Sequence, residues 1–217
     1  MTKIAILGAG KVGTALGRVA VAAGYEVDIA GSESAGRIQL IVDVLVTGAH
    51  AVTAAEAVRG AELVVLALPL HKFRDLDTSL LAGRTVLDIM NYWTPIDGEI
   101  TEFDDAPEGT SVLVQRALPD SRVVKTLNHI GYHELDEEPR PVGAPDRMAL
   151  GAVGDDPDAV ARVLVFLDRI GFDAVGAGPL ANGVAFQPGS PLFGAPYPAE
   201  RFRELLADEL ERTRVAV

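Results

Sequence analysis

Short apolar stretches alternate along the chain with longer segments in which apolar residues recur at helical spacing. The stretches that predict β-strands are 3–7, 25–30, 62–68, 85–89, 122–127, 148–153 and 172–175. Several of them, such as Leu63 to Ala67, do not alternate with polar residues, as expected for parallel strands covered on both faces. The intervening segments that predict helices are 12–23, 35–46, 108–118, 156–171 and 198–212. This order predicts an α/β protein with a doubly wound, mostly parallel sheet of the Rossmann type.

Two segments fit no regular element, 91–107 and 177–198. Long irregular segments in a compact domain tend to be functional loops, so both are expected to lie near a ligand. We divide the chain into a nucleotide-binding domain with the second-substrate loop, 1–180, and a C-terminal loop and helix, 181–217, packed on the same domain.

The strongest motif is Gly8-Ala9-Gly10-Lys11-Val12-Gly13, which follows the first strand and opens the first helix. In this context Gly8 permits a tight turn, Gly10 lets the backbone approach a pyrophosphate, and Gly13 lets the helix pack on the strand. The first N–H groups of the helix, around Lys11 and Val12, would bind the diphosphate. A purely structural turn is the alternative.

The end of the second strand indicates which dinucleotide binds. An NAD site usually has an acid there, about 20 residues past the motif. This chain has Gly31-Ser32 instead, with Glu33 next and Arg37 beyond. Ser32 can donate a hydrogen bond to a 2′-phosphate and Arg37 can supply charge, so NADP is favoured. Arg37 could equally be a solvated helix residue.

The chain resembles the NADPH-dependent coenzyme-F420 reductases (F420H2:NADP oxidoreductases), and also the cytoplasmic reductase domain of the STEAP metalloreductases. The matching residues are Ile6 to Gly13, Gly31-Ser32, Leu66-Ala67-Leu68-Pro69, Asp88-Ile89-Met90-Asn91, Val124 to Asn128, Gly154-Asp155-Asp156 and Ala177 to Leu180. Family members that use NADP usually have arginines after Gly-Ser, where this chain has Glu33 and Ser34.

The resemblance implies hydride transfer between NADP(H) and a planar redox carrier, F420 or a flavin. It places four residues around the nicotinamide: Leu68, Pro69, Met90 and Asn91. It places Asn128 and the loop that follows it toward the second substrate. Two rivals stay open. One is an NADPH-dependent reductase of a small carbonyl or imine compound, with His129, Tyr132 or His133 as proton donor. The other is a nucleotide-binding sensor without catalysis.

The remaining candidates are histidines and the single tryptophan. His71 follows a strand end and could contact the nicotinamide or ribose, or cap a helix. His129 and His133 are four residues apart, but Gly131 interrupts a helix there and no third ligand is placed, so no metal site is predicted. His50 is interpreted as structural. Trp93 follows another strand end and could pack on a ring substrate or on the core.

The composition of the chain limits the classes of molecule that it is expected to bind. The 217 residues carry a net charge of −12, which disfavours nucleic acids and anionic membranes. The chain has no cysteine, so thiolate chemistry is excluded. With no targeting or membrane segment recognised, a soluble cytoplasmic protein acting on a small-molecule redox substrate is expected. The terminal helix has an apolar stripe of Phe202, Leu205, Leu206 and Leu210, which suggests a homodimer or, alternatively, packing within the chain.

Overall fold

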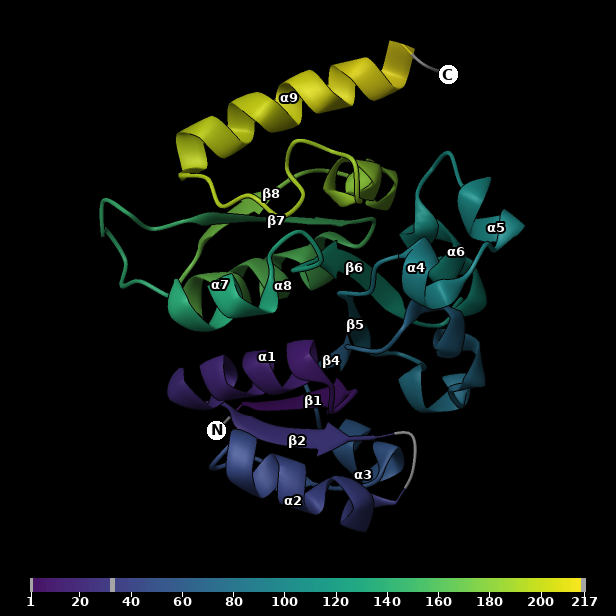
Figure 1. Ribbon diagram of the computed structural model, residues 1–217, viewed down its shortest axis with the longest axis vertical. Coiled ribbons are helices and arrows are strands. Elements are labelled where there is room, and N and C mark those ends of the chain that lie inside the picture. Colours follow the sequence, from purple (N-terminus) through teal and green to yellow (C-terminus); the bar gives the residue numbers. More distant parts are fainter. Residues whose placement is uncertain (1, 32–33, 216–217) are drawn as a thin grey trace.

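The computed structural model describes residues 2–31 and 34–215, which form an eight-stranded sheet between two layers of helices (Figure 1). The strand order is β3-β2-β1-β4-β5-β6-β7-β8, and only the β6–β7 pair is antiparallel. The strands are β1 (Lys3–Leu7), β2 (Glu26–Ala30), β3 (His50–Ala51), β4 (Leu63–Leu66), β5 (Thr85–Asp88), β6 (Arg122–Thr126), β7 (Ala149–Gly154) and β8 (Asp173–Gly176). The doubly wound, mostly parallel Rossmann sheet expected from the sequence is confirmed.

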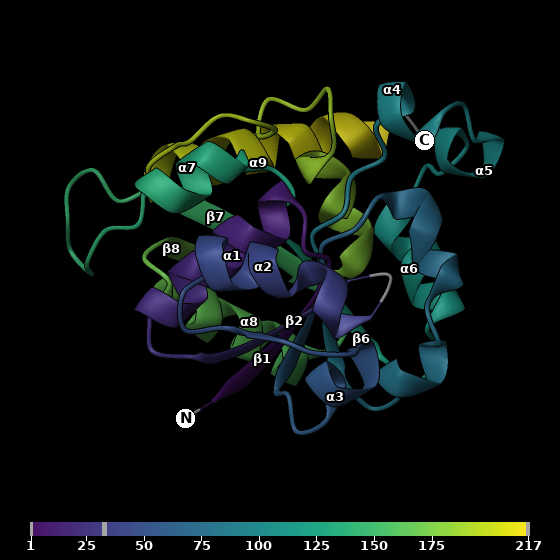
Figure 2. The ribbon, with the colours of Figure 1, turned by 60° about the horizontal axis from the view of Figure 1, so that its bottom comes forward.

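Each face of the sheet has its own set of helices. One face is covered by α1 (Lys11–Ala22), α2 (Ala35–Leu45), α7 (Tyr132–Glu137) and α8 (Pro157–Arg169). The other is covered by α3 (Ala54–Val58), α5 (Thr101–Asp104), α6 (Thr110–Ala117), α9 (Ala199–Val215) and the 3-10 helices η1 (Leu70–Asp75), η2 (Thr78–Leu81) and η3 (Leu180–Phe186). The short helix α4 (Thr94–Asp97) precedes α5. Figure 2 shows α4 and α5 together at one corner of the molecule.

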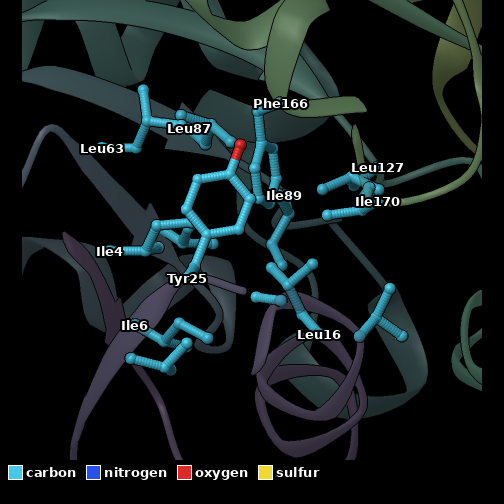
Figure 3. Packing of buried hydrophobic residues seen from close by; sticks show 14 of the residues in the cluster. Ile4, Ile6, Leu16, Tyr25, Leu63, Leu87, Ile89, Leu127, Phe166 and Ile170 are labelled. Carbon is cyan, nitrogen blue, oxygen red and sulfur yellow. The ribbon is translucent and has the colours of Figure 1, made fainter. Parts of the chain in front are cut away.

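Two buried clusters explain why strands such as β1 and β4 consist almost wholly of apolar residues. In β1, Ile4 and Ile6 belong to the cluster under α1 and α8, whereas Ala5 and Leu7 belong to the cluster on the opposite face. Successive side chains of a strand point to opposite faces, so a strand buried on both sides needs no polar position. In the first cluster Tyr25 meets Phe166 edge to face, with ring centroids 5.4 Å apart (Figure 3).

Most predicted elements are confirmed to within a few residues, and the differences concern short ones. The two-residue strand β3 and the five-residue helix α3 were not predicted, and the segments 91–107 and 177–198 contain α4, α5 and η3. α2 is helical despite its many β-branched residues. Its buried side chains are Ile38 and Val42, whereas Leu40 and Val44 are exposed.

The terminal helix α9 lies along η3, β7 and β8 (Figure 1). Phe202 is 1% exposed and Leu206 is 7% exposed, and Leu205 and Leu210 pack against the same cluster. Phe202 and Leu206 are therefore buried within the chain, as the intramolecular alternative predicted, while Leu205 and Leu210 are half-buried. Self-association and the division at residue 180 stay predictions. Within the described residues no helix is both long and apolar enough to cross a membrane.

Candidate active site

The glycine loop between β1 and α1 has the geometry that its sequence predicts. Gly8 has a φ of 133°, and a Cβ there would lie 2.0 Å from the carbonyl oxygen of Ala67. A Cβ on Gly13 would lie 2.0 Å from the carbonyl oxygen of Gly8, because α1 packs directly on the end of β1. A Cβ on Gly10 would meet nothing within 4 Å. The backbone at Gly10 and the first N–H groups of α1 are thus open to an anionic ligand.

A cavity of about 280 Å³ adjoins this loop. Its lining includes Leu7 and Gly8 at the end of β1, Gly31 after β2, and Leu68 and Lys72 after β4. Ser32 and Glu33 lie outside the described residues. Arg37 is exposed in the first turn of α2 and does not line the cavity. The cavity lies where the adenosine half of a dinucleotide binds in Rossmann-type domains, beside the β1–α1 loop.

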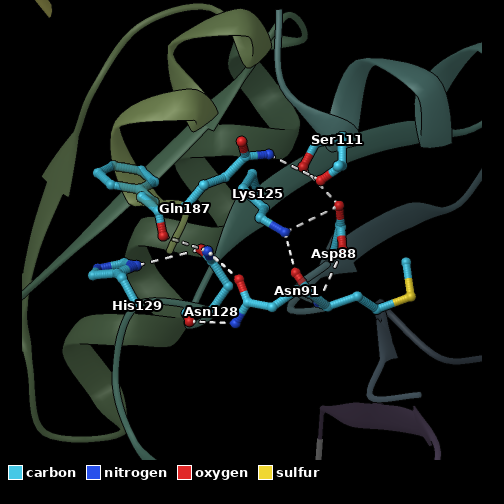
Figure 4. Close-up of polar contacts among 10 residues, drawn as sticks. Asp88, Asn91, Ser111, Lys125, Asn128, His129 and Gln187 are labelled. Carbon is cyan, nitrogen blue, oxygen red and sulfur yellow. Dashed lines mark hydrogen bonds and ion pairs between the residues drawn. The ribbon is translucent and has the colours of Figure 1, made fainter. Parts of the chain in front are cut away.

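A buried ion pair lies at the carboxyl ends of β5 and β6. Asp88 and Lys125 are both 0% exposed, with Nζ 3.4 Å from Oδ2 (Figure 4). Lys125 also donates to the carbonyl of Met90, while Asp88 accepts from the Met90 N–H at 3.0 Å and the Ser111 hydroxyl at 2.7 Å. Burial lowers the pKa of Lys125, and the neighbouring Asp88 opposes that shift. The pair fixes the turn that leads to Asn91.

Asn91 and Asn128 join the loops that follow these two strands. The Asn91 amide donates to the Asn128 carbonyl at 2.7 Å, and the Asn128 amide donates to Asn91 Oδ1 at 3.0 Å (Figure 4). Asn128 also donates to the carbonyl of Phe186 in η3 at 2.7 Å. Leu127, just before it, has a φ of 59°, a left-handed conformation that costs a non-glycine residue energy. Both asparagines are therefore held at the edge where the nicotinamide was expected.

His129 does not suit the role of proton donor that the sequence left open. It is 3% exposed, it stacks on Phe186, and its Nε2 accepts the backbone N–H of Gly151 at 3.2 Å. Burial, and secondly the charge of Lys125, lowers the pKa of His129 to about 3. The side chain is neutral at physiological pH and enclosed in the core. We therefore interpret His129 as structural, a correction to the sequence-based hypothesis.

Tyr132 and His133 lie beside the glycine loop instead. α7 begins at Tyr132 and packs against α1, with Lys11 Nζ 5.3 Å from the centre of the Tyr132 ring. His133 is exposed next to Tyr132, their rings 4.1 Å apart. Because His129 precedes α7 and is buried, the two histidines do not share one helix face. Tyr132 is thus placed near the diphosphate side.

His71 and Trp93 form contacts that the sequence did not indicate. His71 Nδ1 lies 2.6 Å from Oδ1 of Asp97, so it pairs with a side chain rather than with a helix end. Trp93 is 44% exposed and stacks on Phe193, with ring centroids 6.3 Å apart and planes 24° apart. This contact brings together the two irregular segments. Asp97 and Phe193 were missed because only the folded chain brings them to their partners.

Among residues 2–31 and 34–215, Glu26, Asp28 and His50 form a cluster of metal-ligating side chains on the far edge of the sheet. Lys3 Nζ already lies 2.7 Å from Asp28 Oδ2, so a cation partners this carboxylate. A depression of about 490 Å³ beside the end of α1 contains none of the predicted site residues. Neither feature adjoins the glycine loop.

The glycine loop and the surrounding sheet define a Rossmann-type dinucleotide-binding domain, and the family match identifies it as that of an NADP-dependent oxidoreductase. Residues 3–92 match the family described as NADP oxidoreductase, coenzyme F420-dependent, which confirms the resemblance over the nucleotide-binding part of the chain. The other family positions, from Val124 onward, lie outside that match.

Solved structures share the fold over most of the chain. A hypothetical protein from Sinorhizobium meliloti is 27% identical, with a TM-score of 0.79 over 91% of this chain and 95% of its own. A proposed F420-dependent NADP reductase from Arthrobacter sp. is 23% identical, with a TM-score of 0.69 over 100% and 95%. An imine reductase from Bacillus cereus is 17% identical, with a TM-score of 0.56 over 100% and 63%. No curated protein matches this chain.

Proposed function

We propose that this oxidoreductase transfers a hydride between NADP(H) and a planar redox carrier, F420 in particular. The observation that carries the proposal is the stacked Trp93–Phe193 pair beyond the carboxyl edge of the sheet. A flat aromatic surface there suits a flat acceptor, because hydride transfer between two rings depends on close stacking and exclusion of water. The family match and the proposed activity of the Arthrobacter protein agree with F420 as the carrier.

The chain's own residues have separate parts in this proposal. The loop of Gly8, Ala9, Gly10, Lys11, Val12 and Gly13 holds the diphosphate, and its open backbone at Gly10 fits that group. Ser32 and Arg37 hold the adenosine phosphate. Leu68, Pro69, His71, Met90 and Asn91 border the nicotinamide, and Asn128 ties that border to the second-substrate side. Bound NADPH supplies the hydride.

A second candidate is the NADPH-dependent reduction of a small imine or carbonyl compound. The His71–Asp97 pair favours it, since an imine or carbonyl compound has no extended ring system to delocalise the charge it gains and must receive a proton with the hydride. The fold shared with imine reductases is compatible with this activity but does not distinguish it from hydride transfer to F420.

One stopped-flow screen tests both candidates. NADPH-loaded protein is mixed with F420, FMN, a cyclic imine or a small ketone, and NADPH oxidation is followed by absorbance. Rapid turnover with F420 and loss of that turnover in Trp93→Ala would support the first proposal. Turnover only with the imine or ketone would replace it with the second. NADPH binding without oxidation by any acceptor would contradict both.

A further inference from the structure

A histidine–aspartate pair joins the loops that follow β4 and β5. His71 lies in η1 and Asp97 ends α4, and Nδ1 and Oδ1 are 2.6 Å apart. The Asp97 side chain is only 2% exposed, and its second oxygen accepts the Trp93 N–H at 2.7 Å. Both carboxylate oxygens are engaged, so Asp97 is fixed. An ionised carboxylate only accepts hydrogen bonds, so Nδ1 carries the hydrogen that lies between them.

The outer nitrogen of His71 is available to a ligand. The side chain is 34% exposed, and within residues 2–31 and 34–215 no hydrogen bond to Nε2 is formed. A buried carboxylate that fixes Nδ1–H and leaves Nε2 for the substrate is the arrangement by which catalytic histidines are oriented. A histidine that merely filled a surface position would need no buried partner.

The place of the pair in the sheet connects it with the nicotinamide. The strand order reverses between β1 and β4, and dinucleotides bind across the carboxyl ends of the strands at such a point. The adenosine half then lies toward β2 and the nicotinamide half toward β4 and β5. His71 follows Leu68, which lines the same cavity as Gly8. Asp97 lies one short helix beyond Asn91.

We propose that His71 is the proton donor of the reaction and that Asp97 is its positioning residue. This inference rests on the proposed function and adds to it the residue that supplies the proton. Reduction of a deazaflavin or an imine adds a hydride to carbon and a proton to nitrogen. His71 would donate from Nε2 as an imidazolium protonated at both nitrogens, while bound NADPH supplies the hydride. The neutral imidazole then keeps Nδ1–H toward Asp97 and regains its Nε2 proton from solvent. NADPH, one proton and the acceptor thus give NADP+ and the reduced acceptor.

Several charged groups surround this histidine. Lys72, Arg74 and Asp75 lie on its own helix, and Asp97 and Glu102 lie on the elements that face it. Arg74 pairs with Glu102, so its charge is largely compensated. Asp97 is the charged group in direct contact with the imidazole.

The test compares three variants of the full chain. His71→Gln removes the donor, Asp97→Asn keeps the shape but removes the fixed carboxylate, and His50→Gln is the matched control. His50 also pairs with an aspartate, Asp28 at 3.2 Å, but on the far edge of the sheet. We expect kcat to fall about 100-fold in His71→Gln and about 10-fold in Asp97→Asn, as for loss of general acid catalysis. The loss should appear mainly in kcat rather than in the KM for NADPH, and His50→Gln should match the native chain.

A second measurement needs no turnover. Imidazole ¹⁵N NMR of the free protein should show His71 protonated at Nδ1, and Asp97→Asn should change that signal while the His50 signal stays. A neutral His71 protonated only at Nε2 would overturn the positioning role of Asp97. Native-like kcat and pH profile in folded His71→Gln would overturn the donor role. If none of the acceptors leads to NADPH oxidation by the native chain, the proposed function fails. The NMR result still decides whether Asp97 positions His71.

Discussion

Asn91 and Asn128 exchange hydrogen bonds across the carboxyl ends of β5 and β6, at 2.7 and 3.0 Å. Asn128 also donates to the Phe186 carbonyl, so a single amide connects two sheet loops with η3. The asparagines follow the buried Asp88–Lys125 pair by three residues on each strand. The polar network thus continues from the core to the edge where the nicotinamide is proposed to bind.

Asn128→Ala should lower the free energy of unfolding by about 1–3 kcal/mol, because partners of a buried amide lose their hydrogen bonds. Urea denaturation measures this change. NADPH affinity should fall as well, since Asn91 loses its partner. Asn182→Ala is the control, because Asn182 in η3 donates to the Ala177 carbonyl and not to the paired asparagines. Native stability in Asn128→Ala would show that the network contributes little.

Lys125→Met should destabilise the chain by about 3–5 kcal/mol, because it leaves Asp88 as a buried carboxylate without its cation. Adding Asp88→Asn should restore part of that loss, since no unpaired charge then remains. Chemical denaturation of the two single variants and the double variant forms the test. Additive losses in the double variant would contradict coupling of the pair.

The sequence predicted the parts of this molecule that depend on local spacing. The apolar run at Leu63 to Ala67 identified a buried parallel strand, and the glycine motif identified the turn before α1. The helix predicted from residue 156 begins there, where Asp156 caps α8 by accepting the Ala159 N–H at 2.7 Å. Each of these features is determined by residues only a few positions apart.

Contacts between distant segments could not be predicted. Asp97 is 26 positions from His71, and Phe193 lies in another irregular segment from Trp93. Lys125 and Asp88 were noted for the family resemblance, but nothing in their spacing shows that they form a buried pair. His129 was misjudged for the same reason, because only tertiary packing of η3 and α9 encloses it.

Gly10→Val should abolish NADPH binding and leave the fold intact. A Cβ at Gly10 would meet no protein atom within 4 Å, and the valine side chain would fill the space proposed for the pyrophosphate. Gly13→Ala is the contrasting variant, because its Cβ would lie 2.0 Å from the Gly8 carbonyl oxygen and should destabilise the fold by about 1–3 kcal/mol. Calorimetric titration and thermal unfolding separate the two effects. Native NADPH affinity in Gly10→Val would reduce the motif to a structural turn.

The chain should bind NADP(H) more tightly than NAD(H), because Gly31-Ser32 stands where an NAD site has an acid. Arg37→Ala should weaken NADPH binding and leave NADH binding unchanged if its charge meets the 2′-phosphate. Calorimetric titration with NADPH and with NADH measures the two affinities. A tenfold preference for NAD, about 1.4 kcal/mol, would contradict the prediction. Equal affinities would indicate that Glu33 acts as a partial acid substitute.

His129 should make the fold sensitive to acid. In the folded chain its pKa is about 3, because burial penalises the imidazolium, whereas in the unfolded chain it has the ordinary value of 6.5. Between these values the unfolded chain binds a proton that the folded chain does not. The stability contributed by the neutral form is therefore complete above pH 6.5. It is lost as pH falls toward 3, by about 1.4 kcal/mol per pH unit.

His129→Gln tests this dependence, because an amide oxygen can still accept the Gly151 N–H while nothing at that position titrates. Urea denaturation at pH 7, 6, 5 and 4 gives the free energy of unfolding of each chain. The native chain should lose more stability than the variant at each step below pH 6, whatever their difference at pH 7. Equal slopes for the native chain and His129→Gln would show that the imidazole is protonated within the fold, and the core around Phe186 would then have to admit water.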